Sequence, residues 1–127
     1  MKMTILTIED QADIRRLIRM TLEFEGIDVI EAGNGAEGLV LARRHRPDLI
    51  LLDVMMPGLS GLQVSQALAA DPALSHIPVL MLTALAQDGD VAAGLAAGAR
   101  AYLTKPFSPM ELLNVVQGAV GVAQTAA

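Results

Sequence analysis

The sequence predicts an α/β fold in which helices cover both faces of a doubly wound parallel sheet. Short apolar runs recur along the 127 residues and alternate with segments of helical periodicity. Two of these runs are apolar throughout instead of alternating with polar residues, as in parallel strands buried on both faces. The composition, with 53% hydrophobic and 18% charged residues, excludes a disordered chain. We therefore expect one domain with an aliphatic core.

Five apolar runs are the expected strands. They span residues 3–8, 28–30, 49–52, 79–82 and 101–103. The runs at 49–52 and 79–82 are the two that contain no polar residue, and the run at 28–30 is the weakest of the five. Parallel strands of this kind need helical crossovers between them.

Helical patterns fill the intervals between these runs. They cover residues 11–25, a segment that starts at 34–37, residues 61–70, residues 87–97 and a segment from 108 onward. Gly26 can end the first helix in a left-handed conformation. Asn34 and Ser108 each stand three residues before a Glu, which is the spacing of a capping box. Five strand–helix units joined by right-handed crossovers form a doubly wound sheet.

Charge, aromatic content and cysteine count exclude several classes of protein. The formal net charge of −5 and the 2% aromatic content disfavour direct DNA binding, because the electrostatic and the base-stacking contributions are both missing. Without Cys, the chain has neither disulfides nor a thiolate metal site. Its start lacks a signal-peptide pattern, and it has no apolar stretch of about 20 residues. We therefore expect a cytoplasmic protein without a membrane segment.

Polar side chains follow the expected strands at the place where ligands bind in an open parallel sheet, outside the carboxyl ends of the strands. They are Glu9 and Asp10 after the first run, Asp53 after the third, Thr83 after the fourth and Lys105 after the fifth. Three carboxylates this close need a cation, and an oxygen-only site suits a hard ion such as Mg²⁺. Beside that ion, Asp53 can act as a nucleophile toward phosphorus, while Lys105 and Thr83 hold the charged oxygens of the transferring group.

These residues lie within longer motifs. The motifs are Glu9-Asp10, Leu51-Leu52-Asp53-Val54-Met55-Met56-Pro57-Gly58 with Gly61, Thr83-Ala84, Gly98-Ala99 and Tyr102-Leu103-Thr104-Lys105-Pro106-Phe107. In combination they resemble the receiver domains of two-component response regulators, including single-domain chemotaxis regulators, over essentially the whole chain. The resemblance implies a flavodoxin-like sheet with strand order 2-1-3-4-5. It also implies a receiver domain over residues 1–127 without an output domain.

The resemblance further implies a phosphorylation site and its metal. Asp53 would be the phosphoacceptor, and the carboxylates of Glu9, Asp10 and Asp53 with the backbone carbonyl of Met55 would hold Mg²⁺ or Mn²⁺. The phosphoryl donor would be a sensor histidine kinase or a phosphotransfer protein. Such a domain catalyses its own phosphorylation and dephosphorylation and signals to a downstream protein target through changed binding. It is a switch and not a metabolic enzyme.

Other residues of the motifs would complete the switch. Lys105 would pair with a phosphoryl oxygen, and Thr83 would bond another once Asp53 is modified. Tyr102 would then swing inward and reshape the face formed by the fourth helix, the fifth strand and the fifth helix. A half-buried strand aromatic is the plainer interpretation of a lone Tyr, and the motif favours the switch.

Apolar residues flank the expected site. Met55 and Leu85 lie two places beyond the acceptor and the threonine, and neither side chain can orient a water molecule for attack on phosphorus. We therefore expect slow self-dephosphorylation. The chain departs from the family pattern at Ser60, where Asp is common, and at Arg100-Ala101, where acidic residues are common after Gly-Ala. Its fifth helix, from Glu111 onward, carries no Lys or Arg, which disfavours the charged dimer contacts of DNA-binding relatives.

Other classes of protein use similar parts. A phosphohydrolase of the haloacid-dehalogenase type also has an Asp nucleophile and Mg²⁺, but it needs a second Asp where this chain has Met55. A flavodoxin-like mononucleotide binder needs a Ser/Thr/Gly-rich loop after Ile8, where Glu9 and Asp10 would repel a phosphate. A degenerate receiver that acts only as a docking surface is a third alternative, and the complete set of site residues argues against it.

Overall fold

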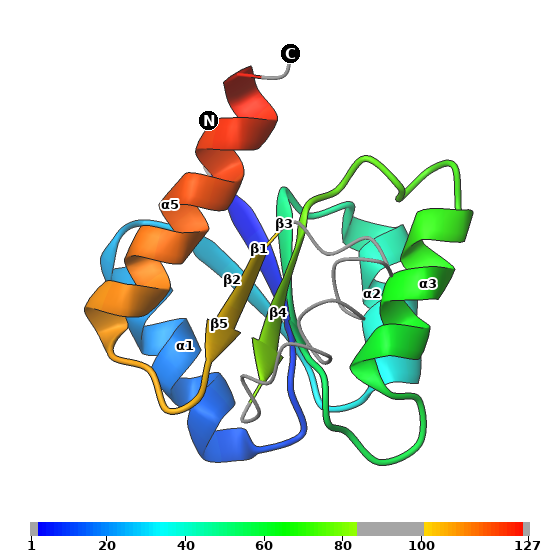
Figure 1. Cartoon of the computed structure of the whole chain (residues 1–127), viewed down its shortest axis with the longest axis horizontal. Coiled ribbons are helices and arrows are strands. Elements are labelled where there is room, and N and C mark those ends of the chain that lie inside the picture. Colours follow the sequence, from blue (N-terminus) through cyan, green and yellow to red (C-terminus); the bar gives the residue numbers. More distant parts are fainter. Residues whose placement is uncertain (1–2, 84–100, 126–127) are drawn as a thin grey trace.

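The computed structural model describes residues 3–83 and 101–125 of the chain. Its strands form one five-stranded parallel sheet with the order β2-β1-β3-β4-β5 (Figure 1). They are β1 (Thr4–Ile8), β2 (Asp28–Ala32), β3 (Leu49–Asp53), β4 (Val79–Thr83) and β5 (Ala101–Thr104). The α/β class and the strand order are both confirmed.

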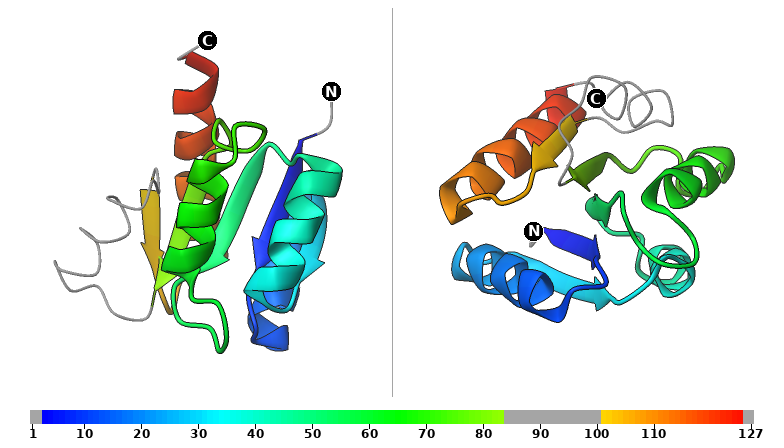
Figure 2. Two further views of the ribbon diagram at one scale, coloured as in Figure 1. Left: turned by 90° about the vertical axis from the view of Figure 1, so that its right-hand side faces the viewer. Right: turned by 60° about the horizontal axis from the view of Figure 1, so that its bottom comes forward.

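Helices cover both faces of this sheet. They are α1 (Ala12–Phe24), α2 (Gly35–His45), α3 (Gly61–Ala70) and α5 (Pro109–Thr125). Helices α1 and α5 lie together on one face, and α2 and α3 lie together on the other (Figures 1 and 2). The helix predicted at 87–97 lies outside the described residues.

Strand β3 separates two apolar layers. Ile50 and Leu52 pack with residues of α2 and α3, whereas Leu49 and Leu51 pack with residues of α1 and α5. All five residues of the strand are buried, which explains why the run is apolar throughout. Because successive side chains point to opposite faces, Asp53 continues the row on the α1 and α5 side.

Caps fix the ends of several helices as the sequence predicts. The Asn34 side chain accepts a hydrogen bond of 2.8 Å from the Glu37 N–H at the start of α2. Ser108 and Glu111 exchange two hydrogen bonds of 3.1 Å and form a complete capping box before α5. Gly26 has a φ of +79°, so α1 is followed by a left-handed residue.

A second complete capping box stands at the start of α3. The Ser60 N–H donates to the Gln63 side chain at 2.9 Å, and the Gln63 N–H donates to the Ser60 hydroxyl at 3.2 Å. Ser and Asp are both strong N-cap residues. The departure from the family pattern at Ser60 therefore preserves the start of the helix.

Strands β1, β3, β4 and β5 differ from the predicted runs by one residue at one end, whereas α1 and β2 each differ by two residues in total. Helix α1 is shorter by one residue at each end, because Gln11 and Glu25 are its flanking caps. Strand β2 continues to Ala32, two residues beyond the predicted run. The charged residue Glu31 conceals this continuation in the sequence, but its carboxylate pairs with two arginines of α1.

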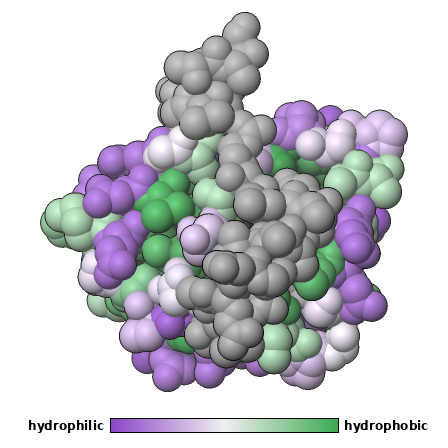
Figure 3. Space-filling model, in the orientation of Figure 1, coloured by the Kyte–Doolittle hydropathy of each residue, from purple (hydrophilic) through white to green (hydrophobic). Residues whose placement is uncertain are grey.

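The exterior is mixed in polarity. On the face in Figure 3, hydrophilic residues occupy much of the outer rim of the described part. Large apolar side chains are exposed at several positions, among them Met20, Phe24 and Met110. Within residues 3–83 and 101–125, no helix has the length and apolar character needed to cross a membrane.

Candidate functional site: an acidic cluster at the carboxyl ends of the strands

Three carboxylates converge at the carboxyl edge of the sheet. Glu9 and Asp10 follow β1, and Asp53 is the last residue of β3, which pairs with β1. One carboxylate oxygen from each of the three lies within 4.8 Å of the others. Glu9 and Asp53 are buried, whereas Asp10 is exposed. The predicted acidic cluster is therefore present, with one open side.

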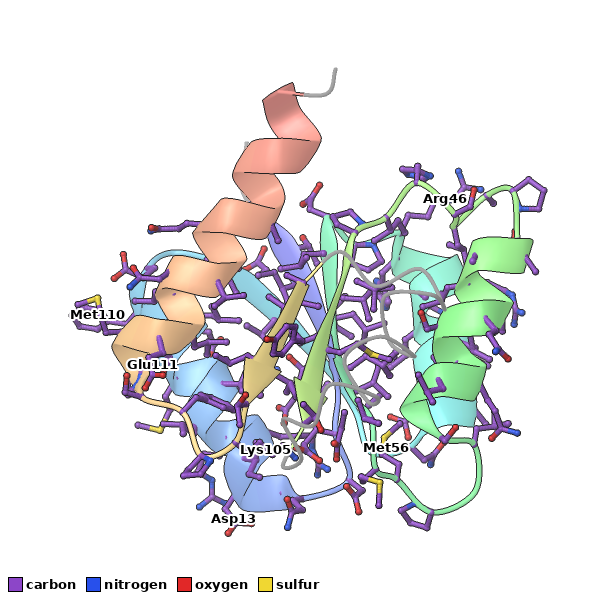
Figure 4. The ribbon with its side chains drawn as sticks, viewed as in Figure 1. Asp13, Arg46, Met56, Lys105, Met110 and Glu111 are labelled. Carbon is purple, nitrogen blue, oxygen red and sulfur yellow. The ribbon has the colours of Figure 1, made fainter. Side chains whose placement is uncertain are left out.

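Lys105 supplies the positive charge of this cluster. It follows β5 and lies at the same edge of the sheet (Figure 4). Its Nζ is 2.5 Å from Oε1 of Glu9 and 3.3 Å from Oδ2 of Asp53. Its side chain is only 13% exposed. Such short, shielded contacts are stronger than ion pairs at the surface.

The Asp53 carboxylate is held from both sides. Its Oδ1 accepts a hydrogen bond of 3.2 Å from the Met55 N–H, and its Oδ2 faces Lys105. The chain beyond it is tied to the sheet, because the Val54 N–H donates to the Leu82 carbonyl at 2.9 Å. The carboxylate therefore keeps a fixed orientation at the end of a buried strand.

Burial strongly perturbs the electrostatics of Glu9. Burial, supported by the neighbouring Asp53 and Asp10 carboxylates, raises the pKa of Glu9 from its ordinary value of 4.5 to about 8. The Lys105 ammonium lowers this pKa but does not outweigh burial. Burial therefore favours the protonated form of Glu9, and a divalent ion would favour its ionised form.

The donor set fits a hard divalent cation. All three side chains offer carboxylate oxygen, the ligand type that Mg²⁺ and Mn²⁺ prefer. The exposed Asp10 leaves room for the water ligands that Mg²⁺ usually retains. The Met55 carbonyl, predicted as a fourth ligand, belongs to the residue whose N–H already contacts Asp53.

Gly61 brings the start of α3 against the beginning of the acceptor loop, which is the segment 54–60 between β3 and α3. Its N–H donates to the Val54 carbonyl at 3.0 Å. A Cβ at this position would overlap the Asp53 carbonyl oxygen and would lie 2.7 Å from the Val54 Cα. Only Gly permits this approach of two backbones. The sequence marks Gly61 as a motif residue, but this reason for it becomes visible only in the structure.

Arg15 is a site residue that the sequence analysis missed. Its Nη1 donates to the carbonyl oxygens of Glu9 and Asp10 at 2.7 and 3.2 Å. The available signal was a cation five residues after the acidic pair, on the flank of α1. That signal alone is weak, since arginines on helix flanks are common solvated residues.

The other predicted residues lie around this cluster. Thr83 is the buried last residue of β4, and its backbone pairs with Thr104. Tyr102, on β5, is 43% exposed, and Met55, in the acceptor loop, is 63% exposed. Leu85 lies outside the described residues. The structure therefore brings Glu9, Asp10, Asp53 and Lys105 into one cluster, and the roles of the surrounding residues remain predictions.

The fold and the acidic cluster define a signalling domain. Residues 5–117 match the family described as the response regulator receiver domain. The chain therefore belongs to the response regulator receiver domain family. It is a phosphoacceptor domain of two-component signalling, a switch rather than a metabolic enzyme. The cluster of Glu9, Asp10 and Asp53 indicates the phosphorylation pocket and has the composition of the divalent-metal site typical of receivers.

Similar proteins include transcriptional regulators and chemotaxis proteins. The DNA-binding response regulator MtrA of Mycolicibacterium paratuberculosis is 42% identical over 117 residues, which are 92% of this chain and 51% of that relative. The phosphate regulon transcriptional regulatory protein PhoB of Pseudomonas aeruginosa is 43% identical over 110 residues, covering 87% and 48%. The chain thus spans about half the length of these curated relatives.

A similar solved structure is that of the chemotaxis protein CheY4 of Vibrio cholerae. It has a TM-score of 0.90 and 33% sequence identity, and the superposition covers 94% of this chain and 99% of that one. A CheY-like receiver domain protein of Methanospirillum hungatei has a TM-score of 0.92 and 26% identity, with full coverage of both chains.

Proposed function

We propose that Asp53 accepts a phosphoryl group from a sensor histidine kinase or a phosphotransfer protein, and that the phosphorylated domain signals by changed protein binding. One observation carries this proposal. The buried Asp53 carboxylate has a backbone N–H on one oxygen and the Lys105 ammonium on the other, beside two further carboxylates. This arrangement provides a nucleophile, a cation for the phosphoryl oxygens and a divalent-metal site at one point.

Glu9, Asp10 and Asp53, with the Met55 carbonyl, are the proposed ligands of Mg²⁺ or Mn²⁺. When bound, the ion would neutralise the carboxylates and the phosphoryl oxygens. An Asp53 carboxylate oxygen forms the bond to phosphorus while the bond from phosphorus to the donor's histidine nitrogen breaks, and the electron pair stays on nitrogen. Lys105, already 3.3 Å from Oδ2 of Asp53, is placed to contact a phosphoryl oxygen.

Thr83 and Tyr102 are the proposed switch residues. A phosphoryl group adds about 1.5 to 2 negative charges and several strong acceptors at the site. The Thr83 hydroxyl would bond one of these oxygens, and Tyr102, now 43% exposed, would turn inward. The strand register supports this coupling, because Thr83 pairs with Thr104, two residues from Tyr102 on β5. The binding face would change beside β5.

The partner of the phosphorylated state is proposed to be a protein. The formal charge of −5 disfavours contact between this chain and a phosphate backbone. The receiver domain itself is the proposed functional unit, acting in the cytoplasm. A domain that serves only as a permanent docking surface would not need the buried arrangement of Asp53 and Lys105.

The test is incubation with acetyl phosphate in the presence and absence of Mg²⁺, followed by intact-mass measurement. We expect a single phosphoryl adduct that depends on Mg²⁺ and is absent from Asp53→Asn. Asp48→Asn is the matched control, since this exposed carboxylate lies just before the opposite end of the same strand. Equal uptake by wild type and Asp53→Asn, or no uptake with any divalent ion, would contradict the proposal.

A further inference from the structure

One arginine tethers the acidic loop, which is the segment 9–11 between β1 and α1 and carries the proposed metal ligands Glu9 and Asp10. Arg15 donates from a single nitrogen, Nη1, to the carbonyl oxygens of Glu9 and Asp10 at 2.7 and 3.2 Å. The tether connects the backbone of the loop to α1. The Glu9 N–H donates to the Ala32 carbonyl at 3.1 Å and ties the same loop to β2.

Arg15 is itself held in place. Its Nε lies 3.3 Å from Oε1 of Glu31 on β2, and both side chains are less than a third exposed. The guanidinium therefore bridges a carboxylate on β2 and two carbonyls after β1. A planar group with several donors in a fixed geometry is suited to this bridge, because one orientation reaches the carboxylate and both carbonyls.

Arg19 provides an internal comparison one turn further along α1. Its Nε lies 3.1 Å from the other oxygen of Glu31, and its Nη2 donates to the Val29 carbonyl at 3.0 Å. Arg15 and Arg19 thus have the same charge, and both contact the Glu31 carboxylate. The contacts of Arg15 reach the acidic loop, whereas those of Arg19 reach β2 and Glu23 on its own helix.

We propose that Arg15, anchored by Glu31, is a positioning residue for the acidic loop and strengthens the binding of the divalent ion without touching it. The inference rests on the proposed function of Glu9 and Asp10 as metal ligands. Residues that orient the ligands of a metal typically contribute a factor of about ten or more to its affinity. Fixing the two carbonyls limits the conformations in which the adjoining carboxylates are held.

A purely electrostatic role for Arg15 predicts a different outcome. A positive charge near the site repels a cation, so its removal alone would strengthen metal binding. Arg15→Lys separates the two roles, because it keeps the charge and loses the planar group that reaches Glu31 and both carbonyls at once. Arg15→Gln removes both the positive charge and the planar guanidinium group.

The test is calorimetric titration of the full chain with Mg²⁺ for wild type, Arg15→Lys, Arg15→Gln, Glu31→Gln and Arg19→Gln. We expect both Arg15 variants to bind about tenfold more weakly. Glu31→Gln should weaken binding less, and Arg19→Gln should stay close to wild type. Amide hydrogen exchange at residues 9–11, measured without metal, should be faster in both Arg15 variants and unchanged in Arg19→Gln.

Specific outcomes would overturn the inference. If Arg15→Lys binds Mg²⁺ with wild-type affinity, or Arg15→Gln binds it more tightly, Arg15 acts through its charge alone. Equal losses in the Arg15 and Arg19 variants would mean a general weakening of α1. If the Arg15 variants do not fold, Glu31→Gln with unchanged affinity would also contradict it. A wild-type chain that binds no Mg²⁺ would overturn the proposed function as well, a result distinct from the others.

Discussion

At the scale of single residues, Lys105 occupies the position that the proposed phosphoryl group needs. Its ammonium bridges Glu9 and Asp53 at 2.5 and 3.3 Å, so the unmodified site already contains an internal counter-ion. Phosphoryl transfer would give this ammonium a phosphoryl oxygen as its partner in place of the Asp53 carboxylate. The exchange keeps the ammonium paired in both states, so neither state leaves an isolated buried charge.

The raised pKa of Glu9 predicts that metal binding depends on pH. Binding requires the ionised carboxylate, so below a pKa of about 8 a proton competes with the ion. Apparent Mg²⁺ affinity should therefore rise with pH toward about 8, by up to about tenfold per unit, and then level off. Calorimetric titration across this range measures it. Glu9→Gln should bind weakly and lose this dependence, and an affinity independent of pH in wild type would contradict the prediction.

The same shift has a consequence for the stability of the metal-free protein. Between about pH 4.5 and 8 the folded state holds a proton on Glu9 that the unfolded state releases. The proton on Glu9 therefore stabilises the folded protein at low pH. This part of the free energy of unfolding is lost as pH rises through the folded pKa. Mg²⁺ should restore it by favouring the ionised form.

A buried hydroxyl in β1 predicts a stabilising substitution. Thr7 is fully buried, and its Oγ1 has no hydrogen-bond partner among the described residues. An unsatisfied buried hydroxyl costs free energy, so Thr7→Val should raise the free energy of unfolding by about 1 kcal/mol. Urea unfolding measures the change. A loss of stability would show instead that a bound water satisfies the hydroxyl.

Met55 predicts how long the phosphoryl group persists. Its side chain is 63% exposed beside Asp53 and cannot orient a water molecule. Met55→Asn should therefore lose the phosphoryl group severalfold faster, as followed by the decay of the mass adduct after removal of the donor. Met110→Asn is a suitable control, since Met110 is 65% exposed and lies on α5. Unchanged decay in Met55→Asn would remove the role assigned to this residue.

At the scale of elements, the start of α3 predicts opposite effects for two glycine substitutions. A Cβ at Gly61 would overlap the backbone of Asp53 and Val54, which cannot yield as a side chain can. Gly61→Ala should lower the free energy of unfolding by about 3 kcal/mol. Gly118, exposed on α5 with nothing within 4 Å of such a Cβ, should gain about 0.8 kcal/mol as Ala.

Thermal or urea unfolding of both variants distinguishes close packing from a general preference for Ala in helices. Two stabilising substitutions would mean that α3 can move away from the acceptor loop without cost. A destabilised Gly61→Ala that also loses phosphoryl uptake would support the close approach as a requirement of the site.

The elements that the sequence predicted best are those whose signals are local. The capping box at Ser108 and the left-handed Gly26 depend on residues within one turn, and both are present. The end of β2 was missed because Glu31 reads as a loop residue. Its carboxylate is accommodated by arginines of α1, and such a partner is visible only after folding.

At the scale of the whole molecule, the topology places the acidic cluster. Parallel strands end at one edge, so residues 9, 10, 53 and 105 could be predicted to converge from the sequence. The pairing of Lys105 with Glu9 could not be predicted, because it depends on side-chain distances across four strands. The Arg15 tether was missed for the same reason.

The sheet also places the proposed switch residues Thr83 and Tyr102 on neighbouring strands. Strands β3, β4 and β5 are adjacent, and Tyr102 lies two residues before Thr104, the partner of Thr83. Two residues along a strand span about 7 Å. A displacement of Thr83 at the acidic cluster is therefore close enough to bias a side chain on the exterior of β5.

The central claim is that a covalent acyl phosphate forms on Asp53. The most direct measurement is borohydride reduction of the protein after incubation with acetyl phosphate and Mg²⁺, followed by peptide mapping, because the reduction converts an aspartyl phosphate to homoserine. The account predicts homoserine at position 53 alone, and none when Mg²⁺ is omitted. Homoserine at another position, or an unmodified Asp53 in a protein that has gained a phosphoryl group, would contradict it.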